Sequence, residues 1–168
     1  MQAATLISVS EYLSTSYRPD CDYVDGRIVE RNVGEKDHSR LQAQLTIYLG
    51  AREKQWRIHL YIEQRVQVKA TRYRIPDVCV VLGQQPDEQI FTAPPFICVE
   101  ILSKDDTMTQ MQERIDDYLQ FGVRYVWVLD PRTRRAYSFT RDGMREASEG
   151  VLRTSEPEIA VPLGEIFS

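Results

Sequence analysis

The sequence predicts an α/β (α+β) protein with a mixed central β-sheet flanked by helices, and an N-terminal helix and β-hairpin added to that core. Short runs rich in Val and Ile, bounded by Gly and Pro, are typical of buried strands, and they occur at residues 73–82 and 96–102. Two longer stretches repeat apolar residues at helical spacing: residues 38–54, and a second predicted helix that opens with the acidic stretch 103–107 and closes at Gly122. The coarse order is therefore helix, three strands, helix, two strands.

Length and composition suit one domain, predicted to span residues 1–168, with residues 1–34 as its N-terminal extension. The chain has 168 residues, of which 42% are hydrophobic and 27% charged, enough for a hydrophobic core. No run approaches 18 apolar residues, so no membrane segment is expected. The net charge of −4 gives no global basic field, and a nucleic-acid contact would have to use a local patch.

The three cysteines predict neither disulfides nor zinc. Cys79 and Cys98 fall in apolar runs and are expected to act as small hydrophobic residues in a reducing, cytoplasmic setting. Neither a Cys-x-x-Cys nor a His-x-x-x-His spacing is present.

The N-terminal extension has clear local signals. Ser8 and Glu11 fit a capping box that opens a short helix reaching about Ser14. Asp25-Gly26 is a tight-turn pair and predicts a hairpin within residues 23–30. After a polar loop, His38 begins the apolar stripe of the first long helix, so it is expected to face inward. It is either a structural histidine or part of a site.

Three neighbouring strands are expected next, at Ile58–Val68, Tyr73–Leu82 and Phe96–Leu102. The first alternates apolar and polar residues, as a half-buried strand does. Pro76 lacks a backbone N–H, so the second strand should begin or bend beside it.

Two carboxylates in these apolar runs are the main candidates for a functional site. Asp77 and Glu100 each stand where a hydrophobic residue is expected. A buried ionised carboxylate is costly unless a cation or strong hydrogen bonds compensate it. On adjacent strands, about 4.8 Å apart, the two acids can share one divalent metal, the arrangement that metal-assisted phosphodiester hydrolysis needs. The alternative is that each acid is bridged to an arginine.

The second long helix has a Met-rich apolar stripe, and Gly122 is its expected C-terminal cap. The stripe is formed by Met108, Met111, Ile115, Tyr118 and Leu119. A buried strand at 125–129 and an antiparallel strand at 136–139 follow, and residues 140–168 should add a short strand and a terminal turn.

The order of elements and several short motifs together resemble the bacterial Uma-type restriction endonuclease family, within the PD-(D/E)xK nuclease superfamily. The resemblance covers about residues 10–139. Its motifs are Asp22-Tyr23-Val24-Asp25-Gly26, His38, Ile75-Pro76-Asp77-Val78, Val99-Glu100-Ile101-Leu102-Ser103, Tyr118, Gly122-Val123 and Tyr125-Val126-Trp127-Val128-Leu129-Asp130-Pro131.

The resemblance implies a restriction-endonuclease-like core in which Asp77 and Glu100 hold Mg²⁺ or Mn²⁺. The superfamily's lysine, two residues after the glutamate, is Leu102 here. Many Uma-type proteins carry a lysine on the following helix instead, and that place is Arg114. An arginine stabilises phosphate charge but does not act as a base. Lys104 and Lys69 are substitutes without motif support. The candidates to complete the metal site are Glu30, Glu63 and His38, and Glu63 is predicted as a further metal ligand.

Two functions remain open at this point. The first is a Mg²⁺-dependent endodeoxyribonuclease, with Asp77, Glu100, Arg114 and His38 as its catalytic residues. The second is a catalytically weak or inactive nuclease-fold protein that acts in binding or assembly. DNA is the expected partner, and a homodimer is expected because cutting both strands of a duplex needs two sites or two binding events.

Overall fold

The computed structural model describes residues 5–32 and 34–168. Its centre is a six-stranded mixed sheet in the order β10-β9-β8-β7-β6-β3. β7 and β8 run parallel, and the other neighbours are antiparallel. The strands are β3 (Ile58–Ile62), β6 (Val78–Leu82), β7 (Ile97–Ile101), β8 (Tyr125–Asp130), β9 (Arg135–Thr140) and β10 (Gly143–Glu146).

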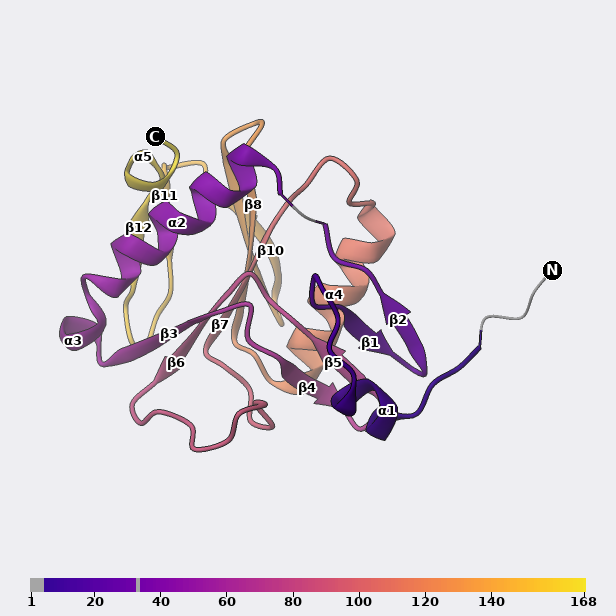
Figure 1. Cartoon of the computed structure of the whole chain (residues 1–168). Coiled ribbons are helices and arrows are strands. Elements are labelled where there is room, and N and C mark those ends of the chain that lie inside the picture. The colour runs from indigo at the N-terminus through magenta and orange to yellow at the C-terminus, as the bar shows by residue number, and fades with distance from the viewer. Residues whose placement is uncertain (1–4, 33) are drawn as a thin grey trace.

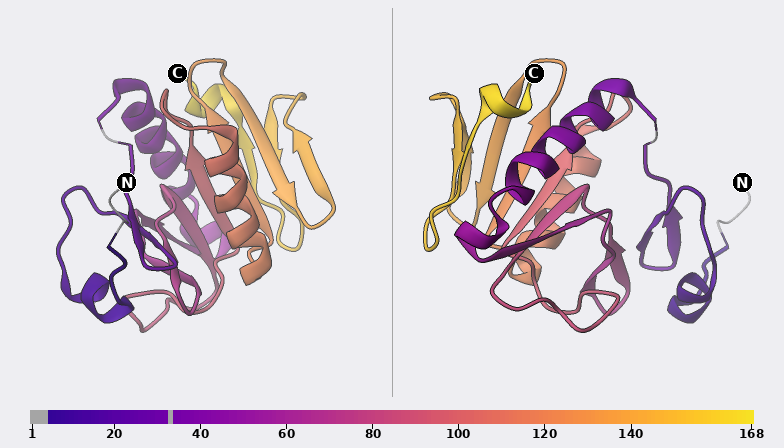
Figure 2. Two further views of the ribbon diagram at one scale, coloured as in Figure 1. Left: turned by 90° about the vertical axis from the view of Figure 1, so that its right-hand side faces the viewer. Right: turned by 60° about the vertical axis from the view of Figure 1, so that its left-hand side comes forward.

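The two long helices cover opposite faces of this sheet, as Figures 1 and 2 show. α2 (Lys36–Gly50) packs Leu41, Leu45 and Leu49 on Val78, Val80, Ile97 and Val99. α4 (Met108–Phe121) packs Met111, Ile115 and Tyr118 on Cys79, Cys98, Val126 and Val128. Successive residues of one strand contact different helices because side chains of a strand point alternately to its two faces. The predicted mixed sheet flanked by helices is confirmed.

A second, four-stranded sheet in the order β2-β1-β5-β4 corrects the predicted strands. It contains β1 (Asp22–Val24), β2 (Arg27–Val29), β4 (Val66–Lys69) and β5 (Arg72–Arg74). The expected single strand Ile58–Val68 is wrong, because it breaks at Glu63, whose φ is 49°, into one strand in each sheet. Tyr73–Leu82 likewise breaks at Ile75-Pro76-Asp77, where Pro76 has no N–H to pair.

The predicted N-terminal helix and hairpin form in the described residues, but the Ser8–Glu11 capping box forms only in part, since the bonds of these residues include none from the Glu11 side chain back to the Ser8 N–H. Residues 1–4 of the predicted extension lie outside the described residues. α1 (Val9–Ser14) begins after Ser8, whose Oγ accepts a hydrogen bond of 3.1 Å from the Glu11 N–H. Asp25 and Gly26, at φ 49° and 90°, form the turn between β1 and β2, since both residues of such a turn need positive φ.

Three further details correct the expectations. The first long helix ends at Gly50, and a separate α3 (Glu53–Trp56) follows. Met108 is not part of the apolar stripe: it is the first residue after the Thr107 N-cap and is 88% exposed. The C-terminal segment adds more than one strand, namely β10, β11 (Val151–Arg153) and β12 (Ala160–Pro162), before α5 (Leu163–Ile166). Gly122 caps α4 in the left-handed conformation, as predicted.

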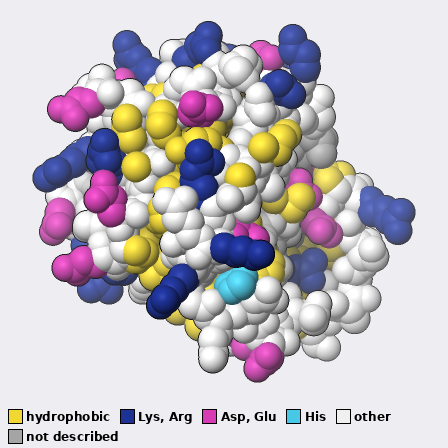
Figure 3. Space-filling view, turned by 90° about the vertical axis from the view of Figure 1, so that its left-hand side faces the viewer, with side chains coloured by type: hydrophobic (Ala, Val, Ile, Leu, Met, Phe, Trp, Pro, Cys, Tyr) yellow, Lys and Arg dark blue, Asp and Glu magenta, His cyan; other side chains and the backbone are white. Residues whose placement is uncertain are grey.

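The surface over α2, α3 and β3 mixes charges of both signs with exposed apolar side chains, as Figure 3 shows. Separate Lys or Arg side chains alternate there with Asp or Glu, and no continuous basic surface covers this side. In the part of the chain that the structure describes, none of the helices combines the length and apolar character that crossing a membrane requires.

Candidate functional site

The two acids singled out in the sequence lie opposite one another on adjacent strands. Asp77 immediately precedes β6 and Glu100 is in β7. The register pairs Val78 with Val99, so its continuation by one residue places Asp77 across from Glu100, on the α4 face of the sheet. Asp77 is 4% and Glu100 5% exposed. Each carboxylate therefore needs partners inside the protein.

Three segments hold the Asp77 carboxylate. Its Oδ2 accepts a hydrogen bond of 2.7 Å from the Ile101 N–H, and the Nε2 of His38, from the first turn of α2, lies 3.3 Å from the same oxygen. Its Oδ1 accepts a hydrogen bond of 3.1 Å from Arg31 Nη2. On the backbone side, Gln42 donates to the Asp77 carbonyl at 2.9 Å. α2 and the segment before it thus fix both the side chain and its backbone.

The Glu100 carboxylate is held from α4. Its Oε1 accepts a hydrogen bond of 2.6 Å from the Tyr118 hydroxyl, and its Oε2 lies 3.8 Å from Arg114 Nη1. That same nitrogen donates to Asp106 Oδ1 at 3.2 Å. Burial raises the pKa of Glu100 to about 7; the Arg114 charge opposes this shift, and the nearby Asp77 charge adds to it.

The pKa of His38 is also raised. Burial alone would lower it, but the hydrogen bond to Asp77 and the charge of that carboxylate outweigh burial. A raised pKa means that the imidazolium persists to higher pH, with its proton directed at Asp77.

A cavity of about 20 Å³ opens between the two acids. That volume holds about one water-sized particle. Asp77, Glu100, His38 and Arg114, all predicted from the sequence, line it together with Asp22, Arg31, Asn32, Ile75, Ile101 and Asp106.

Glu63 is not among the residues that line the cavity. Its side chain is exposed, and it meets Asp77 through the backbone, where the Glu63 N–H donates to the Asp77 carbonyl at 3.2 Å. Lys104 is also exposed. Lys69 lies beside Asp117 at 3.9 Å rather than at the cavity. Among the described residues, the Lys or Arg side chains that line the cavity are therefore those of Arg31 and Arg114.

Sequence reasoning missed Arg31, Asp106 and Asp22. Arg31 stands in a polar segment, and its contact with Asp77 spans 46 residues, so no local pattern marks it. Asp106 lies in the acidic stretch 103–107 that the sequence predicts as the start of the second long helix, whereas α4 begins only after Thr107. Asp22 was noted only as part of a motif, although a buried acid next to a predicted strand is the same signal that marked Asp77.

A buried ionic network supports the cavity from behind. Arg74, 2% exposed, donates to Asp117 Oδ2 at 2.8 Å and to Asp22 Oδ2 at 3.1 Å. Arg72 extends the network by bonding both Asp117 and Asp25. The network thereby joins the β1–β2 hairpin and β5 to α4. Through Arg74 it also holds Asp22, one of the residues that line the cavity.

The ligand chemistry of the cavity suits Mg²⁺ or Mn²⁺. Hard cations of this kind prefer carboxylate oxygens, and Mg²⁺ commonly uses one or two carboxylates and keeps several waters. Asp77 and Glu100 supply such a pair. Within residues 5–32 and 34–168, no group of three or more His, Cys, Asp or Glu side chains is arranged as a complete metal cluster.

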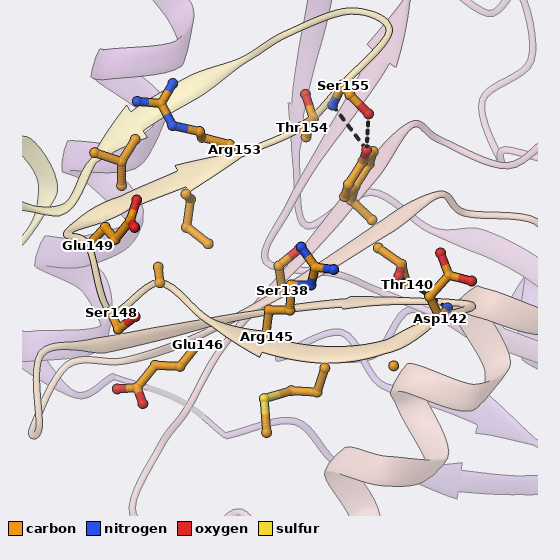
Figure 4. A pocket seen from close by; sticks show the side chains of 16 residues that line it. Ser138, Thr140, Asp142, Arg145, Glu146, Ser148, Glu149, Arg153, Thr154 and Ser155 are labelled. Carbon is orange, nitrogen blue, oxygen red and sulfur yellow. Dashed lines mark hydrogen bonds between the residues drawn. The ribbon is translucent and has the colours of Figure 1, made fainter.

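A larger hollow, of about 650 Å³, lies elsewhere, between the β9–β10 ribbon and β11. Figure 4 shows Ser138, Arg145 and Ser155 among the side chains that line it, and the Tyr125 hydroxyl is hydrogen-bonded to Ser155. Neither acid of the buried pair lines it, and its charged residues carry both signs. We therefore take the small cavity at Asp77 and Glu100, and not this larger hollow, as the candidate active site.

Comparison with known proteins places this geometry in a family. The model of the Uma2 family, described as "Putative restriction endonuclease", matches residues 9–164. The crystal structure of a "putative nuclease belonging to DUF820" from Anabaena variabilis ATCC 29413 superposes with a TM-score of 0.82 at 20% identity, covering 96% of this chain and 97% of that one. No curated protein matches the chain. With nearly its whole length matched by the family model, the chain belongs to the Uma2 family of restriction-endonuclease-like proteins.

Proposed function

We propose that this protein is a metal-dependent endonuclease that hydrolyses DNA phosphodiester bonds. The observation that carries the proposal is the buried Asp77–Glu100 pair, opposed across two strands at one small cavity and bordered by guanidinium groups. The description of the family model, "Putative restriction endonuclease", supports the proposal, because restriction endonucleases act on DNA.

Asp77 and Glu100 are the residues that would hold Mg²⁺ or Mn²⁺. The bound cation would polarise the scissile phosphate and lower the pKa of the attacking water. Four carboxylates and two guanidiniums line the cavity, so added positive charge also favours the approach of an anionic phosphate. We leave Glu63 out of this ligand set because its side chain is exposed and lies outside the cavity lining.

The other side chains position charge and protons. Tyr118 orients Glu100 through its hydroxyl, and Asp106 holds Arg114 beside it. Arg114 stabilises negative charge that develops on the phosphate. His38 keeps its proton at Nε2, toward Asp77 Oδ2, and so holds that carboxylate ionised and oriented.

A second function is favoured by a specific departure from the family pattern. Leu102 occupies the place of the superfamily lysine, and Arg31 already neutralises Asp77. A protein that binds DNA with little or no cleavage is the alternative proposal. Both proposals include DNA as partner and a homodimer in the cytoplasm.

Cleavage of supercoiled plasmid with Mg²⁺ or Mn²⁺ separates the two. The wild-type protein is expected to nick and linearise the plasmid. Asp77→Asn and Glu100→Gln should each slow cleavage at least about 100-fold, since each removes a ligand of the catalytic charge. Asp37→Asn, which changes an exposed acid of α2, is the matched control and should cleave like the wild type. A folded wild type that binds DNA and leaves the plasmid intact would favour the binding protein.

A further inference from the structure

The two guanidiniums at the cavity are held in different ways. Arg114 comes from α4 and lies between two carboxylates, 3.2 Å from Asp106 Oδ1 and 3.8 Å from Glu100 Oε2. Arg31 comes from the chain between β2 and α2, where residues 30–32 and 34–35 have no regular secondary structure. Among the described residues, its ion pair is with Asp77, at 3.1 Å.

Arg31 occupies the oxygen of Asp77 that a cation in the cavity needs. Oδ2 is committed to the Ile101 N–H at 2.7 Å and faces His38. Oδ1 is the remaining oxygen, and Arg31 bonds it. A divalent cation placed on the same oxygen would stand within a few ångströms of the guanidinium, and two like charges at that distance repel strongly in a buried site.

We propose that Arg31 is the exchangeable cation of this site: it neutralises Asp77 until a divalent cation binds there, and it then leaves Oδ1 and binds the phosphate of the DNA substrate. The inference deepens the proposed function and rests on its metal site. Arg31 would thus be a substrate-contacting residue that supplies the charge missing at Leu102.

The surroundings favour Arg31 over the other candidates for this role. Arg114 is tied to Asp106 as well as to Glu100 and would leave two carboxylates unpaired if it moved. Leu102 carries no charge, and its N–H donates a hydrogen bond to the Leu129 carbonyl. An arginine side chain swings by rotating its own bonds, and its planar fork binds phosphate oxygens in pairs.

A purely structural Arg31 makes the opposite prediction for metal binding. If its only task were to fasten the segment before α2, its loss would loosen the site and weaken metal binding. If Arg31 competes with the metal, its loss should strengthen metal binding. The sign of the change therefore distinguishes the two roles.

Calorimetric titration with MnCl₂ measures that sign. Arg31→Gln should bind Mn²⁺ about 10-fold more tightly than the wild type, because the competing charge is gone. Arg31→Lys, which keeps the charge, should bind Mn²⁺ like the wild type. Arg27→Gln changes an exposed arginine at the start of β2 and should also leave the affinity unchanged. Thermal unfolding of each variant without metal verifies that it folds.

Cleavage at saturating Mn²⁺ tests the second half of the proposal. Arg31→Gln should cleave plasmid about 30- to 1,000-fold more slowly than the wild type, the usual effect of losing one cation at the transition state, and Arg31→Lys should restore part of the rate. Tight Mn²⁺ binding with slow cleavage is the expected combination.

Three results overturn the inference. Equal or weaker Mn²⁺ binding by folded Arg31→Gln excludes competition while leaving the metal site intact. Full cleavage by that variant excludes the phosphate contact. Absence of Mn²⁺ binding by both the wild type and Arg31→Gln removes the metal site itself, and with it the proposed function.

Discussion

At the scale of single residues, the carboxyl of Glu100 links the site to the stability of the protein. Its pKa in the folded state is raised from 4.5 to about 7 by burial. Between these values the folded protein holds a proton that the unfolded chain releases, so the free energy of unfolding falls as pH rises through this range. Above pH 7 the Glu100 carboxylate is ionised in the folded protein as well, and the cost of burying this charge lowers the free energy of unfolding by a constant amount.

Glu100→Gln should remove this pH dependence. The amide still accepts the Tyr118 hydrogen bond but carries no charge. At pH 8 the variant should be about 1–3 kcal/mol more stable than the wild type without metal, since one pKa unit corresponds to about 1.4 kcal/mol, and the difference should vanish below the unfolded pKa of 4.5, near pH 4. Urea unfolding at several pH values measures it. Parallel curves for the two proteins would show that Glu100 is not the group responsible.

His38 should report directly on the Asp77 charge. Its raised pKa comes from Asp77, against the effect of burial, so its stabilising contribution is complete below the unfolded pKa, about 6.5, and is lost as pH rises through the folded pKa. In Asp77→Asn we expect the pKa of His38 to fall below that of a free histidine. The chain has two histidines, and His59 serves as the internal control in an NMR titration. A His38 pKa that is unchanged in the variant would rule out Asp77 as its cause.

At the scale of elements, the buried Asp117 holds the small sheet against α4. Asp117 pairs with Arg72 and Arg74, and it is 2% exposed. Asp117→Asn would leave two guanidiniums short of a counter-charge, and breaking a buried ion pair typically costs about 3–5 kcal/mol. Denaturant unfolding should show a loss of that size.

The neighbouring Asp116 provides the control for this prediction. Its side chain is exposed and bonds Gln112 on the same helix. Asp116→Asn should change stability by less than about 0.5 kcal/mol. Equal effects of the two substitutions would mean that the network contributes nothing beyond surface charge.

Local signals predicted some elements well and missed the division into two sheets. The Asp25-Gly26 turn and the Gly122 cap depend on residues adjacent in sequence, and both form as expected. Three consecutive polar residues, Glu63, Gln64 and Arg65, interrupt the alternation of residues 58–68 where the strand breaks, but the apolar positions on both sides keep the same two-residue phase and so suggest one strand. The break depends on β5, which pairs with both β4 and β1, and such long-range pairing has no local signature.

The site residues that could be predicted most directly from the sequence are the ionisable residues that stand within apolar runs. Asp77 and Glu100 stand out because a carboxylate in an apolar run is costly. His38 and Arg114 came from motif position and helical phase. Arg31 is a polar residue in a polar segment, and only the path of the chain from β2 to α2 brings it to Asp77.

At the scale of the whole molecule, the proposed contact with DNA would rest on the few basic side chains at the site, where β6 begins and β7 ends. The face over α2, α3 and β3 mixes both signs (Figure 3), and the cavity brings Arg31, His38 and Arg114 together with four carboxylates. DNA affinity should therefore fall with salt only moderately, with the slope that a few phosphate contacts give. A fluorescence titration at 50 to 200 mM NaCl measures this slope, and a slope typical of ten contacts would contradict it.

A homodimer is the assembly we predict for cutting both strands. β2 lies at one edge of the four-stranded sheet, so the N-terminal hairpin is the expected contact, because an edge strand presents N–H and C=O groups that a second chain can pair with. Sedimentation equilibrium at micromolar concentration should give twice the 19.5 kDa of one chain. A monomer at that concentration would exclude the dimer.

A cation shared by Asp77 and Glu100 is the claim on which the function depends, and anomalous diffraction from crystals soaked in MnCl₂ tests it most directly. The expected result is one strong manganese peak within about 2.5 Å of an oxygen of each carboxylate, with the Arg31 guanidinium withdrawn from Asp77 Oδ1. Absence of a peak at the cavity in fully soaked crystals, with Arg31 still bonded to Asp77, would contradict it.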